Sequence, residues 1–172
     1  MSRDTFERLA PGQLERLYRY ARRLVRDPEQ AADLVQDTFE RALRYRNRVR
    51  SEADLRPLLF RILQNLYVDR WRVRSRHELP LFEPPEDLPG PEVVHEALSD
   101  EVERALMELH DSWRATLWLR DVEGFSYDEI AEITGTAVGT VRSRLSRARR
   151  QMAERLAEYA RARALLSEEV RV

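Results

Sequence analysis

The sequence contains no cysteine and no lysine, and it has no apolar run long enough to cross a bilayer. Without cysteine there is no disulfide framework, no thiol nucleophile and no thiolate metal site. A membrane span needs roughly 20 consecutive apolar residues. The N-terminal stretch MSRDTFERLA carries charges where a signal peptide needs its apolar segment. These absences predict a soluble cytoplasmic protein with no direct membrane insertion.

What is abundant instead is arginine, which supplies all 30 basic side chains of the 172 residues. The exclusive use of arginine has two interpretations. It can reflect genome composition or a hot habitat, and it also suits the recognition of phosphates and bases. The net charge is −1, but residues 1–76 carry +7, residues 77–103 carry −9 and residues 104–172 carry +1. This distribution says more about nucleic-acid binding than the near-neutral total does.

The acidic segment is also where the chain changes character. Residues 77–94, HELPLFEPPEDLPGPEVV, hold five of the eight prolines, and proline blocks helix and removes backbone donors. We therefore expect an extended linker over residues 77–97, between a domain at 1–76 and a second at 98–172. About 25 extended residues at ~3.3 Å each reach on the order of 80 Å, enough to separate two DNA-binding modules along a duplex.

Residues 1–76 show helical periodicity and no strand pattern. Apolar positions predict a first helix from Phe6 to about Arg26, and Asp27-Pro28 predicts the N-cap and first turn of a second. Ser51 is the expected cap of a third. The sequence thus predicts an all-α protein of two small helical domains.

Two of these expected helices carry polar stripes. The second helix aligns acids and amides, and the third carries a polar outer side rich in arginine. The stripe of the second helix is Glu29, Asp33, Gln36, Asp37 and Glu40, and that of the third is Arg61, Asn65, Asp69, Arg72 and Arg76.

Residues 126–149, SYDEIAEITGTAVGTVRSRLSRAR, predict a helix-turn-helix. Ser126 and Glu129 form a capping box for the first helix, and Gly135 supplies the positive φ that the turn needs. The second helix has one apolar stripe, and no acid occurs between Glu132 and Glu154. The polar side of that helix makes up the candidate DNA-reading set: Thr140, Arg142, Ser143, Arg144, Ser146, Arg147 and Arg150. A merely solvated basic face is the simpler alternative.

Three stretches together resemble the extracytoplasmic-function sigma factors, the smallest group of the sigma-70 family. They are DPEQAADLVQDTFERA (27–42), LLFRILQNLYVDRWR (58–72) and VEGFSYDEIAEITGTAVGTVRSRLSRAR (122–149), in the family's order and with the family's linker between the last two. Leu58 stands where members often carry tryptophan, and the stretch before Arg114 lacks a proline common in the family.

The resemblance implies roles for individual residues. Asp33, Gln36 and Asp37 match the helix that docks on a coiled coil of the largest polymerase subunit, and the flap of the polymerase is a further partner. Arg61, Asn65, Arg72 and Arg76 match the element that opens the duplex and holds the minus-ten element, with Asn65 near the extruded base. The helix after Gly135 would read the minus-thirty-five element. An anti-sigma factor is a further implied partner; no cofactor, metal or small-molecule substrate is implied.

The alternatives come from other classes of protein. A serine recombinase also joins a domain to an arginine-rich helix-turn-helix, but residues 1–76 show only helices and one early serine, Ser2. Metal catalysis is disfavoured because His77, His95 and His110 lack ligand-like spacing. A free-standing helix-turn-helix repressor or activator remains open, with the tail at residues 156–170 as a possible dimer interface. That interpretation leaves residues 27–72 without a role.

Overall fold

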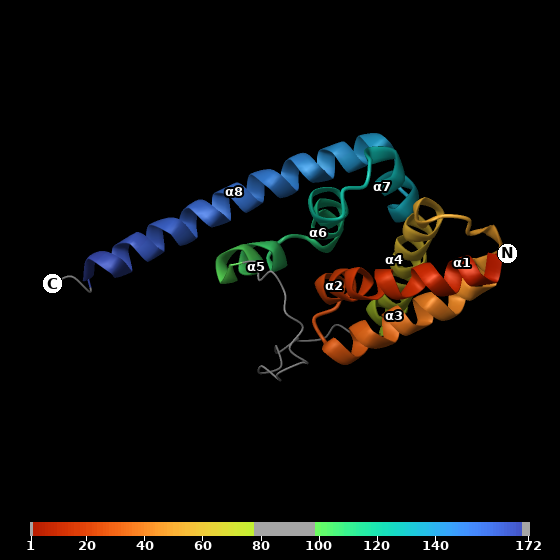
Figure 1. The fold of residues 1–172 in the computed structure, drawn as a ribbon. Coiled ribbons are helices and arrows are strands. Elements are labelled where there is room, and N and C mark those ends of the chain that lie inside the picture. Colours follow the sequence, from red (N-terminus) through yellow and green to blue (C-terminus); the bar gives the residue numbers. More distant parts are fainter. Residues whose placement is uncertain (1, 78–98, 170–172) are drawn as a thin grey trace.

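The computed structural model describes the backbone of residues 2–77 and 99–169, and the side chains of residues 5–70 and 99–162. These residues form helices and turns and include no strand, which confirms the all-α prediction. The helices belong to an N-terminal unit (residues 2–77) and a C-terminal unit (residues 99–169) (Figure 1). The expected linker at 77–97 lies outside the described residues from position 78 onward.

The N-terminal unit begins with a helix that is shorter than the sequence predicted. One helix was expected from Phe6 to about Arg26, but a 3₁₀ turn interrupts it at Pro11. Proline lacks the amide hydrogen and its ring blocks the preceding turn, so the chain tightens there. The unit consists of α1 (Ser2–Leu9), η1 (Ala10–Gln13), α2 (Leu14–Leu24), α3 (Pro28–Ala42), η2 (Leu43–Arg48) and α4 (Glu52–His77).

The expected caps of α3 and α4 are both present. The carboxylate of Asp27 accepts from the amides of Glu29 (2.8 Å) and Gln30 (3.3 Å). The Ser51 hydroxyl accepts from the amide of Asp54 at 3.3 Å. Each cap satisfies backbone donors that have no partner within the helix. The two helices that carry the candidate docking and minus-ten residues therefore start where local sequence places them.

A buried polar contact helps to fix α4 against α2. The Tyr20 hydroxyl donates to Gln64 Oε1 at 2.7 Å, and Tyr20 is completely buried, which raises the pKa of its phenol. Around it, each large apolar side chain contributes roughly 1.5–3 kcal/mol by leaving water. The largest fully buried ones in this unit are Leu17, Leu34, Leu55, Leu59, Phe60 and Leu63.

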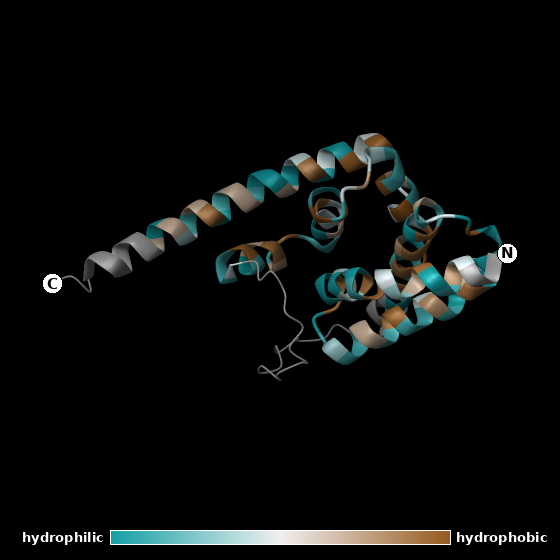
Figure 2. Cartoon of the chain, in the orientation of Figure 1, coloured by the Kyte–Doolittle hydropathy of each residue, from teal (hydrophilic) through white to brown (hydrophobic). Residues whose placement is uncertain are grey.

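The C-terminal unit is built along one long helix, α8 (Val138–Glu169). Beneath it in Figure 1 lie the shorter elements, α5 (Asp100–Met107), α6 (Asp111–Leu117), the π-helical turn η3 (Trp118–Val122) and α7 (Tyr127–Thr134). The tail that the sequence set apart as a possible dimer interface continues α8 as far as Glu169. Hydrophobic and hydrophilic residues alternate along the coloured part of this helix (Figure 2).

The two units pack against each other, an arrangement that the sequence left open. α4 lies against α7, and α2 lies against α6. The rings of Phe60 and Phe125 meet edge to face with centroids 5.2 Å apart, and both are almost completely buried. Aromatic pairs of this geometry contribute about 0.5–1.5 kcal/mol beyond the area they bury. Buried apolar residues from the two units consequently form a single cluster.

Candidate DNA-reading and polymerase-docking surfaces

The turn between α7 and α8 has the geometry that the sequence predicted. Ser126 Oγ accepts from the amide of Glu129 at 3.2 Å, and Glu129 Oε2 accepts from the amide of Ser126 at 2.7 Å. Gly135 ends α7 with φ 64°, in the left-handed region. The amide of Thr136 then reaches back to the carbonyl of Ala131 at 3.0 Å. These contacts fix the direction in which α8 leaves the turn.

The first four turns of α8 have one buried side and one exposed side. Val141, Leu145 and Ala148 are at most 1% exposed, which anchors this part of the helix to the C-terminal unit. The candidate reading residues lie on the other side: Arg142, Ser143, Ser146, Arg147 and Arg150 are exposed, and Thr140 and Arg144 are half-buried. The structure therefore places this set on an accessible face of a rigid helix.

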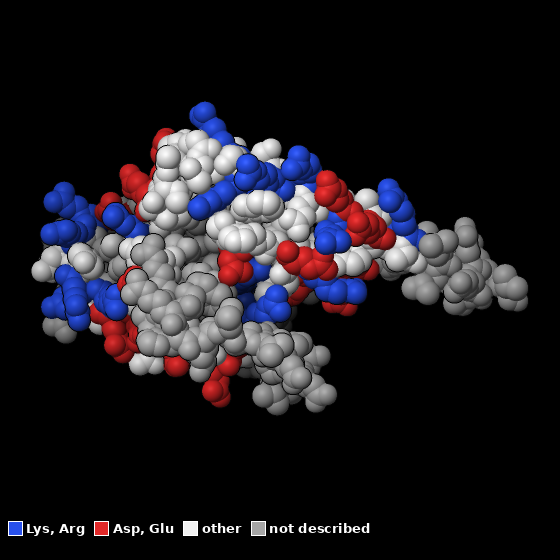
Figure 3. Space-filling model, turned by 180° about the vertical axis from the view of Figure 1, so that it is seen from behind, with Lys and Arg blue, Asp and Glu red and all other residues white. Residues whose placement is uncertain are grey.

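Arg149 lies in the same stretch but differs from the candidate reading residues, because it is bound to an acidic side chain of its own unit. Its guanidinium donates to Asp121 at 2.6 Å, which ties α8 to η3 and raises the pKa of Arg149. The sequence placed five arginines in the acid-free stretch, and the structure assigns this one to an intramolecular ion pair. Seen from behind, basic side chains lie over the N-terminal half of α8, and acidic ones accompany them towards the other half (Figure 3).

The candidate docking residues share a face of α3 but differ in their contacts. Asp33 and Gln36 are exposed, and the amide of Gln36 donates to Glu40 Oε1 at 3.1 Å. Asp37 is half-buried and forms an ion pair with Arg70 of α4. This pair joins two helices across 33 positions of sequence, so it is a finding of the structure.

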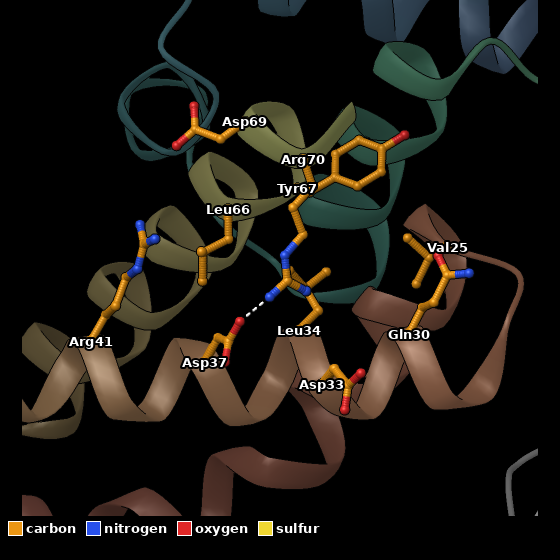
Figure 4. Close-up of a pocket in the computed structure, with 10 residues that line it drawn as sticks. All are labelled: Val25, Gln30, Asp33, Leu34, Asp37, Arg41, Leu66, Tyr67, Asp69 and Arg70. Atoms are coloured by element: carbon orange, nitrogen blue, oxygen red, sulfur yellow. Dashed lines mark hydrogen bonds and ion pairs between the residues drawn. The ribbon is translucent and has the colours of Figure 1, made fainter. Parts of the chain in front are cut away.

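An open groove of about 540 Å³ lies between α3 and α4. Asp33 and Asp37 belong to its α3 side, and Leu66 and Arg70 to its α4 side. In Figure 4 the guanidinium of Arg70 reaches across the groove to Asp37. The groove thus joins the helix of the candidate docking residues to the helix of the candidate minus-ten residues.

Two of the candidate minus-ten residues are placed on one side of α4. Arg61 and Asn65 are exposed and stand one turn apart, while Ile62 and Leu66 between and beside them are buried. A helix packed in this way presents the Asn65 amide from a rigid support. The side chains of the other two, Arg72 and Arg76, lie outside the described residues.

The most deeply buried charges lie between the units, where the sequence gave no signal. Arg114 is 3% exposed; its Nε donates to the carbonyl of Arg23 in α2 at 2.6 Å, and its Nη2 donates to Asp111 at 2.6 Å. Glu123 is 7% exposed and accepts from Arg56 of α4. A buried charge is tolerated when it is paired and hydrogen-bonded. These groups therefore stabilise the contact between the units.

Neither a metal cluster nor a bilayer-spanning helix occurs within the described parts of the chain. His110 has a local task instead, because its Nδ1 accepts from the amide of Ser112 at 3.3 Å and caps α6. His77 and His95 have no described side chains.

Comparison with protein families assigns both units. Residues 13–77 match sigma-70 region 2, and residues 99–152 match sigma-70 region 4. The chain is 35% identical to the ECF RNA polymerase sigma factor SigE of Mycolicibacterium smegmatis, over 90% of this chain and 63% of that protein. It is 34% identical to the ECF RNA polymerase sigma factor SigM of Mycobacterium tuberculosis, over 90% of this chain and 78% of that protein. The chain thus spans less than two thirds of the first relative.

Solved structures of similar fold include two protein complexes. The sigma factor RpoE of Bartonella quintana, solved with the anti-sigma factor NepR, has a TM-score of 0.73 at 30% identity. That match covers 88% of this chain and 96% of RpoE. CnrH, solved with the cytosolic domain of CnrY, has a TM-score of 0.61 at 26% identity, covering 89% of this chain and 88% of the other.

Proposed function

This chain belongs to the extracytoplasmic-function group of the sigma-70 family, and on that premise we propose that it binds core RNA polymerase and directs transcription initiation at specific promoters. The observation that carries the proposal is the exposed, capped helix-turn-helix in one unit together with a separate acidic face on α3 of the other. In this role the protein acts in the cytoplasm as a specificity subunit and performs no bond-making chemistry of its own.

The C-terminal unit would read the minus-thirty-five element through the exposed face of α8. An α-helix fits the major groove, where arginine pairs with guanine and serine or threonine contacts base edges or phosphates. The contacts would come from Thr140, Arg142, Ser143, Arg144, Ser146, Arg147 and Arg150. Ser143 Oγ already donates to the carbonyl of Thr140 at 3.0 Å, so its oxygen is left to accept.

The N-terminal unit would recognise and open the minus-ten element. Asn65 offers both donor and acceptor groups to an unstacked base, and Arg61, Arg72 and Arg76 would bind backbone phosphates. Taking a base out of the stack costs a few kcal/mol, and the new contacts must repay that cost. Burial of Ile62 and Leu66 supports the role of Asn65, because it holds α4 in place while the Asn65 amide contacts the base.

Docking on the largest polymerase subunit would use Asp33, Gln36 and Asp37, while the C-terminal unit would engage the flap. In this arrangement residues 1–76 are the region 2 domain, 77–97 the linker and 98–172 the region 4 domain. An anti-sigma factor is a further proposed partner, supported by the similarity to RpoE in its complex with NepR.

Reconstitution tests the proposal directly. The purified chain is mixed with core polymerase, and retention of the complex and run-off transcription are measured on promoters that core polymerase alone ignores. We expect a stable complex and new, discrete transcripts. Tight sequence-specific DNA binding without polymerase, and no transcripts with it, would identify a free-standing repressor or activator instead.

A further inference from the structure

Asp37, one of the three proposed docking residues, already holds a cation in the free protein. Its carboxylate is paired with the guanidinium of Arg70, 33 positions along the chain and on a different helix. Both side chains remain partly accessible, at 45% for Arg70 and 38% for Asp37. A partner can therefore reach this carboxylate, but it has to compete for it.

The position of Arg70 on α4 explains why it pairs with α3. It follows Leu59, Leu63 and Leu66 at helical spacing, so it continues the buried stripe that faces the core. At about 100° per residue, Arg70 points about 140° away from Asn65 around the helix axis. It accordingly stands apart from the face that Arg61 and Asn65 share, and the proposed DNA contacts leave it without a role.

The groove around this pair is lined by carboxylates from both helices and by apolar side chains. Asp33 and Asp37 line it from α3 and Asp69 from α4, with Leu34 and Leu66 between them. Two arginines, Arg41 and Arg70, line the groove among the described residues. Figure 4 shows only Arg70 joined to a carboxylate of the groove. Its guanidinium is the group that a cationic partner would have to replace.

We propose that Arg70 is an internal competitor for polymerase docking, displaced from Asp37 by a cationic side chain of the polymerase. The inference rests on the proposed function and adds a residue that limits its affinity. Arg70 binds one carboxylate oxygen of Asp37, Oδ2, so a polymerase cation that takes the whole carboxylate in a bidentate manner has to displace it. Docking then exchanges one ion pair for another. The exchange lowers the affinity of docking and reduces its dependence on salt, because Arg70 already neutralises much of the charge of Asp37.

The experiment measures binding of the labelled full-length chain to purified core polymerase at several salt concentrations. The variants are Arg70→Gln, Asp37→Asn and the double variant, with Arg19→Gln as control. Arg19 lies on α2, with its Nε 3.9 Å from Glu15 Oε1. Its replacement also removes one positive charge from the same unit. Circular dichroism checks that each variant keeps its helices.

We expect Arg70→Gln to bind core polymerase about two- to five-fold more tightly, the range expected from releasing an exposed ion pair. Its affinity should also fall more steeply with salt than that of the wild type. Asp37→Asn should weaken binding. Adding Arg70→Gln to it should give no gain in affinity, because the carboxylate with which Arg70 competes is then absent. The control should bind like the wild type.

Each other outcome has a distinct meaning. Unchanged or weaker binding by Arg70→Gln, or a gain that persists beside Asp37→Asn, overturns the competitor role while leaving docking intact. Wild-type binding by Asp37→Asn removes Asp37 from the docking surface and overturns the inference with it. A wild-type chain that does not bind core polymerase contradicts the proposed function itself.

Discussion

On α8, Arg147 is exposed and lies about 160° around the helix axis from the buried Leu145. We predict that Arg147→Ala weakens promoter binding by the holoenzyme by about 1–3 kcal/mol, the usual loss for a base-contacting arginine. Folding should change by no more than about 0.5 kcal/mol, because the side chain lies on the surface. Quantitative run-off transcription and thermal unfolding measure the two effects.

Arg149 provides the matched control for that experiment. It lies two residues further along the same helix, but Asp121 holds its guanidinium. Arg149→Ala should therefore affect promoter use less than Arg147→Ala does. Equal promoter activity of Arg147→Ala and the wild type would show that another side of α8 faces the DNA.

Asn65 is the residue on which the proposed opening of the duplex depends most. An extruded base needs replacement hydrogen bonds, and losing one costs roughly 1–3 kcal/mol. We predict that Asn65→Ala binds core polymerase and closed promoter DNA normally but accumulates little open complex. A pre-melted template should restore part of its activity. Permanganate footprinting decides the point, since wild-type levels of unpaired thymine would make Asn65 an ordinary surface amide.

Residues whose roles depend on near neighbours were predictable from the sequence, and those with distant partners were not. Ser126 finds Glu129 three positions away, and Gly135 needs only its own positive φ, so the turn was visible in the motif. Arg70 and Arg114 instead bind groups 33 and 91 positions distant. No helical periodicity encodes such a separation, so these contacts required the fold.

At the scale of the elements, α3 separates a packing side from the proposed docking side. Leu34, Val35 and Thr38 are buried, and Asp33 is exposed on the other side. We predict that Asp33→Arg abolishes measurable binding to core polymerase at physiological salt and leaves the helix content unchanged. A pull-down and circular dichroism test this.

Asp33→Arg also changes the net charge of the protein, so a second charge reversal serves as the control. Glu15→Arg reverses an exposed acid on α2 and should retain binding. Loss of binding in both variants would point to overall charge as the cause, and retention in Asp33→Arg would place the docking surface elsewhere. Asp33 is preferred to Asp37 here because its replacement leaves the ion pair with Arg70 in place.

The long helix α8 joins the proposed reading face to the far end of its unit. At about 1.5 Å per residue, its 32 residues extend roughly 48 Å. Beyond the reading face, Tyr159 donates to Glu108 Oε1 at 2.7 Å and Arg155 binds Glu108 Oε2 at 2.8 Å. These side chains, Tyr159 of the tail and Arg155 just before it, are therefore engaged within the chain, which weakens the case for that part of α8 as a dimer interface.

At the scale of the whole molecule, the closed packing of the two units opposes the separation that two promoter elements require. The contact combines the Phe60–Phe125 pair with Arg56, whose guanidinium lies 4.3 Å from the centroid of the Phe125 ring and binds the carboxylate of Glu123. Arg114 adds a buried link to α2. In the proposed holoenzyme, these contacts must break before the two units can separate.

Arg56→Ala tests this opposition, because it removes the cationic partner of a carboxylate that is 7% exposed and leaves it only the indole N–H of Trp118. A buried carboxylate that loses its charged partner costs about 1–3 kcal/mol, so the equilibrium should move roughly 5- to 150-fold towards separated units. The absence of native cysteine allows specific labelling through Glu40→Cys on α3 and Ala153→Cys on α8, both at exposed positions. We predict lower energy transfer between dyes at these sites in Arg56→Ala than in the wild type.

The matched control is Arg61→Ala, which replaces an exposed arginine of the same helix and should retain the wild-type energy transfer. Equal transfer in all three proteins would mean that the Arg56–Glu123 pair does not hold the units together.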